Sequence, residues 1–516
     1  MSSTSNPSVT SKPTKKPAAM DKTVLFLQLV SKIPLMARVA LLHMLQTSPA
    51  SKYQDLRTEL IIAMLRSFID VPKPKSITST QKILSTAPPI SGTIWVSKYT
   101  LPIPTEEDAR AIHDTLNKVI DGLQDRDQPK TARIQLPEVL PVEAEWTAHR
   151  PGVPKDAKLP DIPEREKYDE MMKDVKTPTT VLYFHGGAYW LMDPATHRPT
   201  CRELAKRTGG RCYSVRYRLA PQNPFPAAVM DALVSYLGLL YPPADAFHEA
   251  VKPEHIVIAG DSAGGNLSLA LLQLIMQLQR SGTTVSWLGE ERSVPLPAGV
   301  AVNSPWMDIT HSSPSCVTNA PFDYLPSIEV QEKSEKGRDP CSAWPANPPR
   351  MSIYVADDYI MHPLVSLLLA PSWRGAPPTY ICTGWEILAD EDKFTAARFH
   401  AEGVSVTFEE YEGMPHCFAM LLKNLREADR CMEGWSRFIA RVTKPTASEG
   451  GFDGDDDKQK STTRSTFTTI KSGTLEEKKL DPTTLSPYTE EEIREKIRRR
   501  VELKCVPATE GDVAKL

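Results

Sequence analysis

The chain has 516 residues, of which 41% are hydrophobic, so it can form one large domain with additional segments, or two domains. Its 61 basic and 64 acidic residues leave a formal charge of −3, which gives no reason to expect a nucleic-acid partner. The eight cysteines lack the close spacing of metal ligands, so we expect no metal or other cofactor, and a reducing intracellular compartment.

The N-terminal segment is expected to begin disordered and to continue as a helical cap. Residues 1–23 are rich in Ser, Thr, Pro and Lys, a composition typical of disorder. Residues 24–45 are apolar but contain Lys32 and Arg38, and a charge near the bilayer centre costs about 2.5–3.5 kcal/mol, which argues against a membrane span. We therefore expect residues 24–90 to form a helical cap segment. The alternative is that 24–45 lies peripherally on a membrane or lipid surface.

A catalytic domain is expected over residues 91–443, because apolar runs of strand length recur there. The first two strands are predicted at 95–99 and 142–146. Later strands are predicted at 181–184, 255–259, 377–383 and 404–408.

A loop of small residues follows the strand at 181–184. Gly186, Gly187 and Ala188 allow backbone N–H groups to point into a cavity, as in an oxyanion hole. His185 is expected to bond to backbone groups and shape this loop rather than act as a base.

The sequence Gly-Asp-Ser-Ala-Gly at residues 260–264 lies between a predicted strand and a predicted helix. A serine on such a sharp turn requires flanking glycines, because a Cβ would collide with the neighbouring elements. The pattern predicts Ser262 as a nucleophile, with the N–H of Ala263 as a further oxyanion donor.

Candidate acid and base residues follow two later strands. Glu386 and Asp390 come after the strand at 377–383, and His416 comes after the strand at 404–408. The resulting chain order of Ser, acid and His is that of α/β hydrolases, whereas other serine hydrolase folds order these roles differently.

The C-terminal segment, residues 444–516, is expected to be a largely disordered tail. One helix is predicted over 489–503, with Thr489 as its N-cap and Glu492 three residues later. The last residues, Ala514-Lys515-Leu516, resemble a peroxisomal targeting tripeptide. The alternative locations are the cytosol and an endomembrane surface.

Together these motifs resemble the hormone-sensitive-lipase-like (α/β hydrolase fold-3) esterases of the α/β-hydrolase superfamily. Tyr-Arg-Leu-Ala-Pro at 217–221 and Ser-Pro-Trp-Met-Asp at 304–308 extend the resemblance beyond the triad, over about 183–418. It implies an α/β-hydrolase fold, with a mostly parallel central sheet flanked by helices. It also implies that an insertion at about 306–361 joins the N-terminal helices in a cap.

The sequence departs from the family pattern at two positions. Ala188 stands where the family usually has a third glycine; its N–H remains a donor, but its methyl group limits how closely a bulky substrate approaches. Glu386 stands where the family more often has aspartate. Its separation of 30 residues from His416 resembles the family spacing better than the 26 residues from Asp390.

The resemblance implies a serine hydrolase that cleaves small hydrophobic carboxylic esters through an acyl-enzyme intermediate. His416 would take the proton of Ser262, and Glu386 would orient His416. The alternatives are an amidase or deacetylase using the same triad, and a non-catalytic ligand-binding protein of this fold, against which the presence of His416 argues. The sequence leaves the oligomeric state open. The aromatic residues expected to line the substrate pocket are Tyr189, Trp190 and Trp306.

Overall fold

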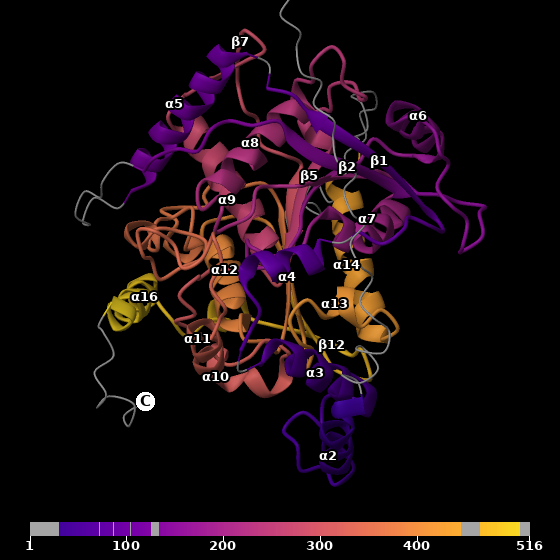
Figure 1. Cartoon of the computed structure of the whole chain (residues 1–516), viewed down its shortest axis with the longest axis vertical. Helices are drawn as coiled ribbons and strands as arrows, with labels where there is room; N and C mark the ends of the chain where they lie inside the picture. The colour runs from indigo at the N-terminus through magenta and orange to yellow at the C-terminus, as the bar shows by residue number, and fades with distance from the viewer. Residues whose placement is uncertain are drawn as a thin grey trace, which may run out of the picture.

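The structure is a computed structural model that describes residues 30–444 and 465–505, apart from residues 72, 86, 104 and 125–133. In Figure 1 helices lie on both sides of a central sheet, and the N-terminal helices α2 and α3 lie at its lower end. The predictions for residues 1–23 and for Ala514-Lys515-Leu516 lie outside the described residues.

Ten strands of the described residues form one sheet in the order β1-β2-β4-β3-β5-β8-β9-β10-β11-β12. Neighbouring strands from β4 to β11 run parallel, whereas β1, β2 and β12 pair antiparallel with their neighbours. This confirms the predicted α/β fold with a mostly parallel central sheet. The strands are β1 (Ile94–Leu101), β2 (Val142–His149), β3 (Thr180–Phe184), β4 (Arg211–Val215), β5 (Ile256–Asp261), β8 (Gly299–Asn303), β9 (Thr379–Gly384), β10 (Val406–Tyr411), β11 (Thr466–Ile470) and β12 (Glu477–Lys479).

The central strands are largely apolar because helices cover both faces of the sheet. Every residue of β3, β5 and β9 is buried. Side chains of α8, α9 and α12 pack in one hydrophobic core, and side chains of α7 and α14 pack in a second. The helices and the small hairpin outside the cap are α5 (Glu106–Leu123), α6 (Glu164–Asp174), α7 (Pro194–Thr208), α8 (Ala227–Leu240), η1 (Pro253–His255), α9 (Ala263–Arg280), β6 (Val285–Trp287), β7 (Glu290–Arg292), α12 (Ala389–Ala401), α13 (Phe418–Leu421) and α14 (Arg426–Val442).

The described part of the N-terminal segment is helical, as predicted. It contains α2 (Ile33–Met44), α3 (Leu56–Ile69) and α4 (Ile77–Leu84). No side chain of α2 is buried, and Figure 1 shows this helix projecting from the body of the molecule. None of the described helices combines the length and the apolar character that a membrane span requires.

The insertion after β8 packs against this N-terminal segment, which supports the expectation that the two form one cap. Arg66 of α3 donates a hydrogen bond to the carbonyl of Ala320 (2.7 Å), and the N–H of Asp339 donates to the carbonyl of Pro74 (3.1 Å). The short helices of this region are α10 (Ser315–Thr318), η2 (Ala320–Phe322), α11 (Ile328–Lys336), η3 (Asp357–Tyr359) and η4 (Leu367–Leu369).

The prediction that the C-terminal segment is largely disordered is wrong for residues 465–505. β11 extends the sheet by pairing parallel with β10, and Phe467 and Ile470 are buried. Threonines fill the other positions of the strand, and β-branched residues of this kind suit a pleated strand even though they give a polar composition. The rest of this segment contains β12, η5 (Pro482–Thr484) and α16 (Glu490–Cys505).

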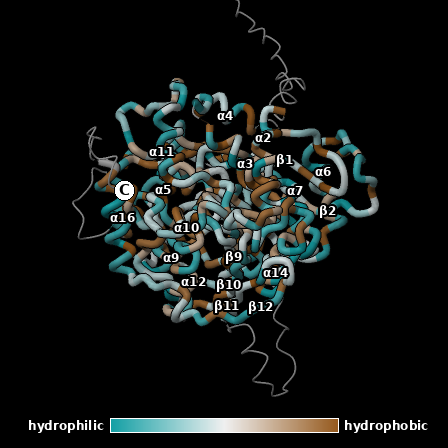
Figure 2. The backbone as a smooth tube through the Cα atoms, turned by 90° about the horizontal axis from the view of Figure 1, so that it is seen from below, coloured by the Kyte–Doolittle hydropathy of each residue, from teal (hydrophilic) through white to brown (hydrophobic). Residues whose placement is uncertain are grey.

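The predicted helix near 489–503 is present as α16. The N–H of Glu492 donates to Oγ1 of Thr489 (3.2 Å), and the N–H of Thr489 donates to the Glu492 carboxylate (2.8 Å), as the capping pattern predicts. Arg500 pairs with Glu332 of α11 (2.6 Å). In Figures 1 and 2 α16 and α11 accordingly lie on the same side of the molecule.

Candidate active site

Ser262 occupies a strained turn between β5 and α9. Its φ of 53° and ψ of −121° are values that a non-glycine residue rarely adopts. A Cβ at Gly264 would lie 2.0 Å from the carbonyl oxygen of Phe184, and a Cβ at Gly260 would lie 2.4 Å from that of Gly264. Both glycines are therefore required by close backbone approach. Ser262 itself is only half-buried, whereas Asp261 and Ala263 beside it are buried.

His416 contacts Glu386 and not Asp390. The imidazole Nδ1 lies 2.9 Å from Oε2 of Glu386, and the hydroxyl of Thr383 donates to Oε1 of the same carboxylate (2.8 Å). Asp390 instead accepts the N–H of Ser315 (2.9 Å). Of the two candidate acids, only Glu386 is placed to orient the histidine.

The environment of His416 favours its protonated form. Burial is the largest single effect and lowers the pKa of His416, but the charge and hydrogen bond of Glu386, together with nearby carboxylates, raise the pKa above its usual value. Asp323 and Asp261 act in the same direction. Because Nδ1 is engaged by Glu386, Nε2 is the nitrogen available as a base. No hydrogen bond among the described residues joins the Ser262 hydroxyl to His416, and such contacts often tighten only when substrate binds.

The loop after β3 offers backbone donors beside the turn between β5 and α9 that carries Ser262, here called the elbow. A Cβ at Gly186 would lie 2.2 Å from a carboxylate oxygen of Asp261, and Gly187 has a φ of 114°. Ala188 also has a positive φ, 52°, a conformation in which glycine is unstrained. Within the described residues, the N–H groups of Gly186, Gly187, Ala188 and Ala263 donate no hydrogen bond. These are the predicted oxyanion donors.

His185 shapes this loop, as the sequence predicted. Its Nδ1 donates to the carbonyl of Gly186 (2.7 Å), and its ring stacks on Tyr217 with centroids 4.3 Å apart. The Tyr217 hydroxyl donates to the carbonyl of His185 (2.6 Å). Burial lowers the pKa of His185 to about 3, so the ring is neutral at pH 7.

A buried polar group behind the elbow was missed by the sequence analysis. Asp261 accepts a hydrogen bond from the Tyr183 hydroxyl (2.6 Å), and its other oxygen lies 3.3 Å from Nε2 of His197. Burial opposes ionisation, but His197 and Tyr183 lower the pKa of Asp261. The carboxylate is therefore ionised and fixed against Gly186. No local pattern links His197, on α7, to the elbow.

The three aromatic residues predicted to line the substrate pocket differ in their surroundings. Tyr189 is buried in the core, where its hydroxyl donates to Asn266 (2.6 Å) and its ring stacks on Tyr354 at 3.7 Å. The ring is therefore enclosed by the core in this structure, and the role of Tyr189 in substrate binding stays a prediction. Trp190 and Trp306 are half-buried, and the backbone N–H of Trp306 donates to the carbonyl of Ser262 (3.0 Å). Their role in substrate binding stays a prediction.

The described residues contain no group of three or more His, Cys, Asp and Glu side chains that could hold a metal ion. The cysteines among them are free thiols, and most are buried. Two of them, Cys382 and Cys431, have sulfur atoms 3.6 Å apart.

Comparison with known proteins identifies the family. A sequence profile described as the alpha/beta hydrolase fold matches residues 181–420. The chain is 30% identical over 266 residues to an acetyl-hydrolase of Streptomyces hygroscopicus, a match that covers 51% of this chain and 76% of the relative. The chain belongs to the alpha/beta hydrolase family.

A second relative and a solved structure agree with the assignment of this chain to the α/β hydrolases. The chain is 30% identical over 276 residues to an esterase of Acinetobacter venetianus, covering 53% of this chain and 78% of that protein. The crystal structure of an esterase from the bacterial hormone-sensitive lipase family shares its fold, with a TM-score of 0.50 at 22% identity, covering 76% of this chain and 99% of that one. The resemblance to hormone-sensitive-lipase-like esterases and the prediction of a carboxylic ester hydrolase are confirmed.

Proposed function

We propose that this α/β hydrolase cleaves hydrophobic carboxylic esters by nucleophilic catalysis at Ser262. The observation that carries the proposal is the 2.9 Å contact between His416 and Glu386, since it orders the one histidine that follows β10 and leaves Nε2 as a base. The strained turn at Ser262 and the backbone N–H groups of the loop after β3, which donate no hydrogen bond within the described residues, also support this proposal.

The reaction has two steps, acylation of Ser262 and hydrolysis of the acyl-enzyme, and His416 is the base in both. Oγ of Ser262 attacks the ester carbonyl carbon while Nε2 of His416 takes the hydroxyl proton. The tetrahedral intermediate collapses, and the alkoxide leaves with the proton from His416 as a neutral alcohol. A water molecule then attacks the acyl-enzyme, again giving its proton to His416. Release of the acid returns the proton to Ser262.

The negative charge that develops on the carbonyl oxygen requires fixed donors. The N–H groups of Gly187, Ala188 and Ala263 supply them from two elements, the loop after β3 and the start of α9. Removing one such donor typically lowers turnover by about 10² to 10³. Because the donors are backbone groups in a strained loop, the loop geometry matters as much as the side chains.

We also propose that α2 contacts an anionic lipid surface. Its exposed apolar side chains include Ile33, Leu41 and Met44, and the helix carries Arg38 but no acidic residue. An apolar helix face with flanking positive charge binds at the boundary of lipid headgroups and acyl chains.

The test of the catalytic proposal is hydrolysis of p-nitrophenyl esters of graded acyl length. The wild type should turn them over, and Ser262→Ala should lower kcat by at least about 10³. Ser235→Ala is the matched control, because this buried serine on α8 bonds only within its own helix, to the carbonyl of Asp231. Ligand binding without ester turnover by the wild type would contradict the proposal. A higher kcat/KM for the matching p-nitroanilides would favour an amidase.

A further inference from the structure

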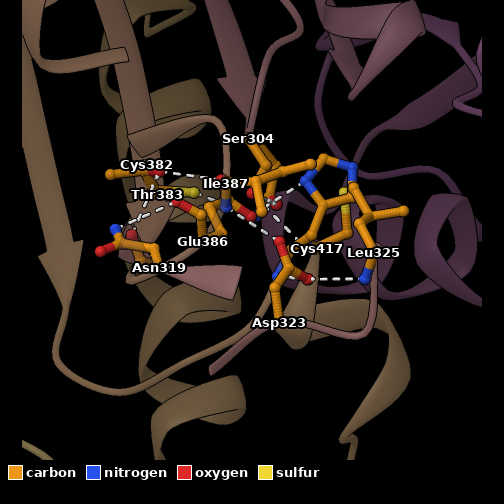
Figure 3. Close-up of polar contacts among 12 residues, drawn as sticks. Ser304, Asn319, Asp323, Leu325, Cys382, Thr383, Glu386, Ile387 and Cys417 are labelled. Atoms are coloured by element: carbon orange, nitrogen blue, oxygen red, sulfur yellow. Dashed lines mark hydrogen bonds and ion pairs between the residues drawn. The ribbon is translucent and has the colours of Figure 1, made fainter. Parts of the chain in front are cut away.

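The carboxylate of Asp323 bridges the two loops that carry Glu386 and His416 (Figure 3). Its Oδ1 accepts the backbone N–H of His416 (3.2 Å), and its Oδ2 accepts the N–H of Ile387, the residue after Glu386 (3.0 Å). Asp323 belongs to neither loop, since it lies in the insertion after β8. It is buried, so these hydrogen bonds form in a region without competing water.

The backbone around Asp323 is held in turn by the N-terminal cap. Arg66 of α3 donates hydrogen bonds to the carbonyl oxygens of both Ala320 and Asp323. The side chain of Asn319 in the same segment donates to the carbonyl of Glu386 (3.1 Å). The segment 319–323 therefore contacts α3 of the N-terminal segment and also both of the loops that carry Glu386 and His416.

The loop that carries His416 is held at two consecutive N–H groups. Asp323 accepts the N–H of His416, and the hydroxyl of Ser304 accepts the N–H of Cys417 (3.2 Å), a residue in the left-handed conformation with φ of 51°. Both acceptors come from the chain that follows β8. A strained loop of this kind keeps its shape only when its surroundings fix it.

Asp323 also acts on His416 through its charge. Burial raises the pKa of Asp323 to about 6; His416 opposes this shift and Glu386 adds to it. The carboxylate is therefore mostly ionised at pH 8, where it adds to the effects of Glu386 and Asp261 on His416. Arg66 is the cation that faces Asp323, and the neutral Tyr324 ring lies 6.1 Å from that of His416.

We propose that Asp323 is a positioning residue, which fixes the loops of Glu386 and His416 relative to one another and links them to the cap through Arg66. The proposal rests on the proposed function, because it assigns Asp323 an effect on the triad. Asp323 does not contact the reacting atoms in this proposal.

The first experiment compares Asp323→Asn with Asp308→Asn in the full-length protein. Asparagine can accept only one of the two N–H groups and carries no charge. We expect kcat for a p-nitrophenyl ester to fall by about tenfold to a hundredfold with KM changed less than about threefold, as for a small misplacement of catalytic groups. Loss of the negative charge should lower the pKa of His416. The acid limb of the kcat/KM profile, where activity falls as His416 becomes protonated, should therefore move to lower pH by about 0.5 or more.

Asp308→Asn is the matched control, because Asp308 is also a buried carboxylate that accepts two backbone N–H groups, those of Thr310 and Ser312 (both 2.8 Å). It should leave the acid limb in place and kcat within about threefold. Unchanged kcat and an unchanged acid limb in folded Asp323→Asn would overturn the proposal.

A second measurement does not depend on ester turnover. NMR titration of the His416 imidazole should give a lower pKa in Asp323→Asn than in the wild type, even if the natural reaction is not ester hydrolysis. Failure of the wild type on every ester, together with this shift, would contradict the proposed function and leave the positioning role intact. If Asp323→Asn does not fold, the variant Arg66→Met tests the link between the Asp323 segment and the N-terminal cap. It should lower kcat about threefold or more at constant KM. An unchanged kcat would overturn that link.

Discussion

The pairing of His416 with Glu386 makes the clearest prediction for a single side chain. A general base must be neutral, and the pKa of His416 is raised. The midpoint of the acid limb of kcat/KM should therefore lie at a higher pH than the usual pKa of histidine. Glu386→Gln removes the negative charge that stabilises the imidazolium. We therefore expect the acid limb to move to lower pH and kcat to fall about 10³- to 10⁴-fold. The measurement is a kcat/KM profile against pH.

Asp390→Asn is the control for this prediction, because it is the neighbouring acid that the sequence left open and it bonds to Ser315 instead. It should keep kcat within about threefold and leave the acid limb unchanged. A larger loss in Asp390→Asn than in Glu386→Gln would reverse the assignment of the acid.

Gly187 makes a second prediction, on the oxyanion loop. Its φ is 114°, and a Cβ there would lie 2.4 Å from the carbonyl oxygen of Leu191. Gly187→Ala must therefore shift the loop that carries the donors, and we expect kcat to fall by about 10² or more. Gly289→Ala separates this effect from backbone strain alone, because Gly289 also has a positive φ, 73°, but has no atom within 4 Å of its added Cβ. Equal kcat losses in both variants would contradict a catalytic role for the loop.

The residues that the sequence predicted well are those with a local pattern. Ser262 lies near glycines on a strand-to-helix turn and His416 follows a recognisable strand, so both could be proposed from local patterns combined with their order along the chain. Asp323 and His197 act on the same site from 93 and 64 residues away from the groups that they contact. Because their contacts arise only when distant segments fold together, no spacing in the sequence indicates them.

At the scale of elements, α2 makes a prediction about surface binding. Leu41 and Met44 are 53% and 68% exposed, so burying them in a lipid interface would remove apolar surface from water. We expect the protein to co-sediment with vesicles that contain anionic phospholipid, and less with neutral vesicles. The double variant Leu41→Glu and Met44→Glu should lose this binding while ester turnover in solution remains.

Val317→Glu is the matched control for α2, since Val317 is also an exposed apolar residue, at 68%, but lies on α10. It should co-sediment like the wild type. Equal loss of binding in the two variants, or no binding by the wild type, would contradict a role for α2 as the contact.

The elements themselves were predicted unevenly, for a physical reason. Strands such as β3 and β5 are covered on both faces and are therefore continuous apolar runs, which the sequence displays directly. β11 buries only Phe467 and Ile470 and fills its other positions with threonine, so its composition resembles that of a disordered tail. Its stability comes from pairing with β10, which a single-segment pattern does not contain.

At the scale of the whole molecule, the N-terminal segment and the turn after β11 meet beside the loop that leads to His416. Gln54 of the N-terminal segment donates to the carbonyls of Gly413 (2.6 Å) and Phe322 (3.1 Å). The hydroxyl of Ser472, just after β11, donates to the carbonyl of Tyr53. The cap, the insertion, the catalytic loop and the C-terminal strand therefore share one junction. We infer that these parts unfold together rather than as separate units.

Gln54→Leu tests this cooperativity, because it leaves the buried carbonyl of Gly413 without its donor and also removes the hydrogen bond to Phe322. An unsatisfied buried polar group costs about 1–3 kcal/mol, so we expect a lower Tm. Hydrogen exchange should accelerate in α3 and in β11 at the same time, with α8 unchanged. Gln222→Leu is the control, since its side-chain hydrogen bond to Gln81 (2.8 Å) is exposed to solvent and its loss should change Tm little. Faster exchange in α3 without any change in β11 would show that the N-terminal segment and β11 open independently, and the junction would then be only a contact between separate units.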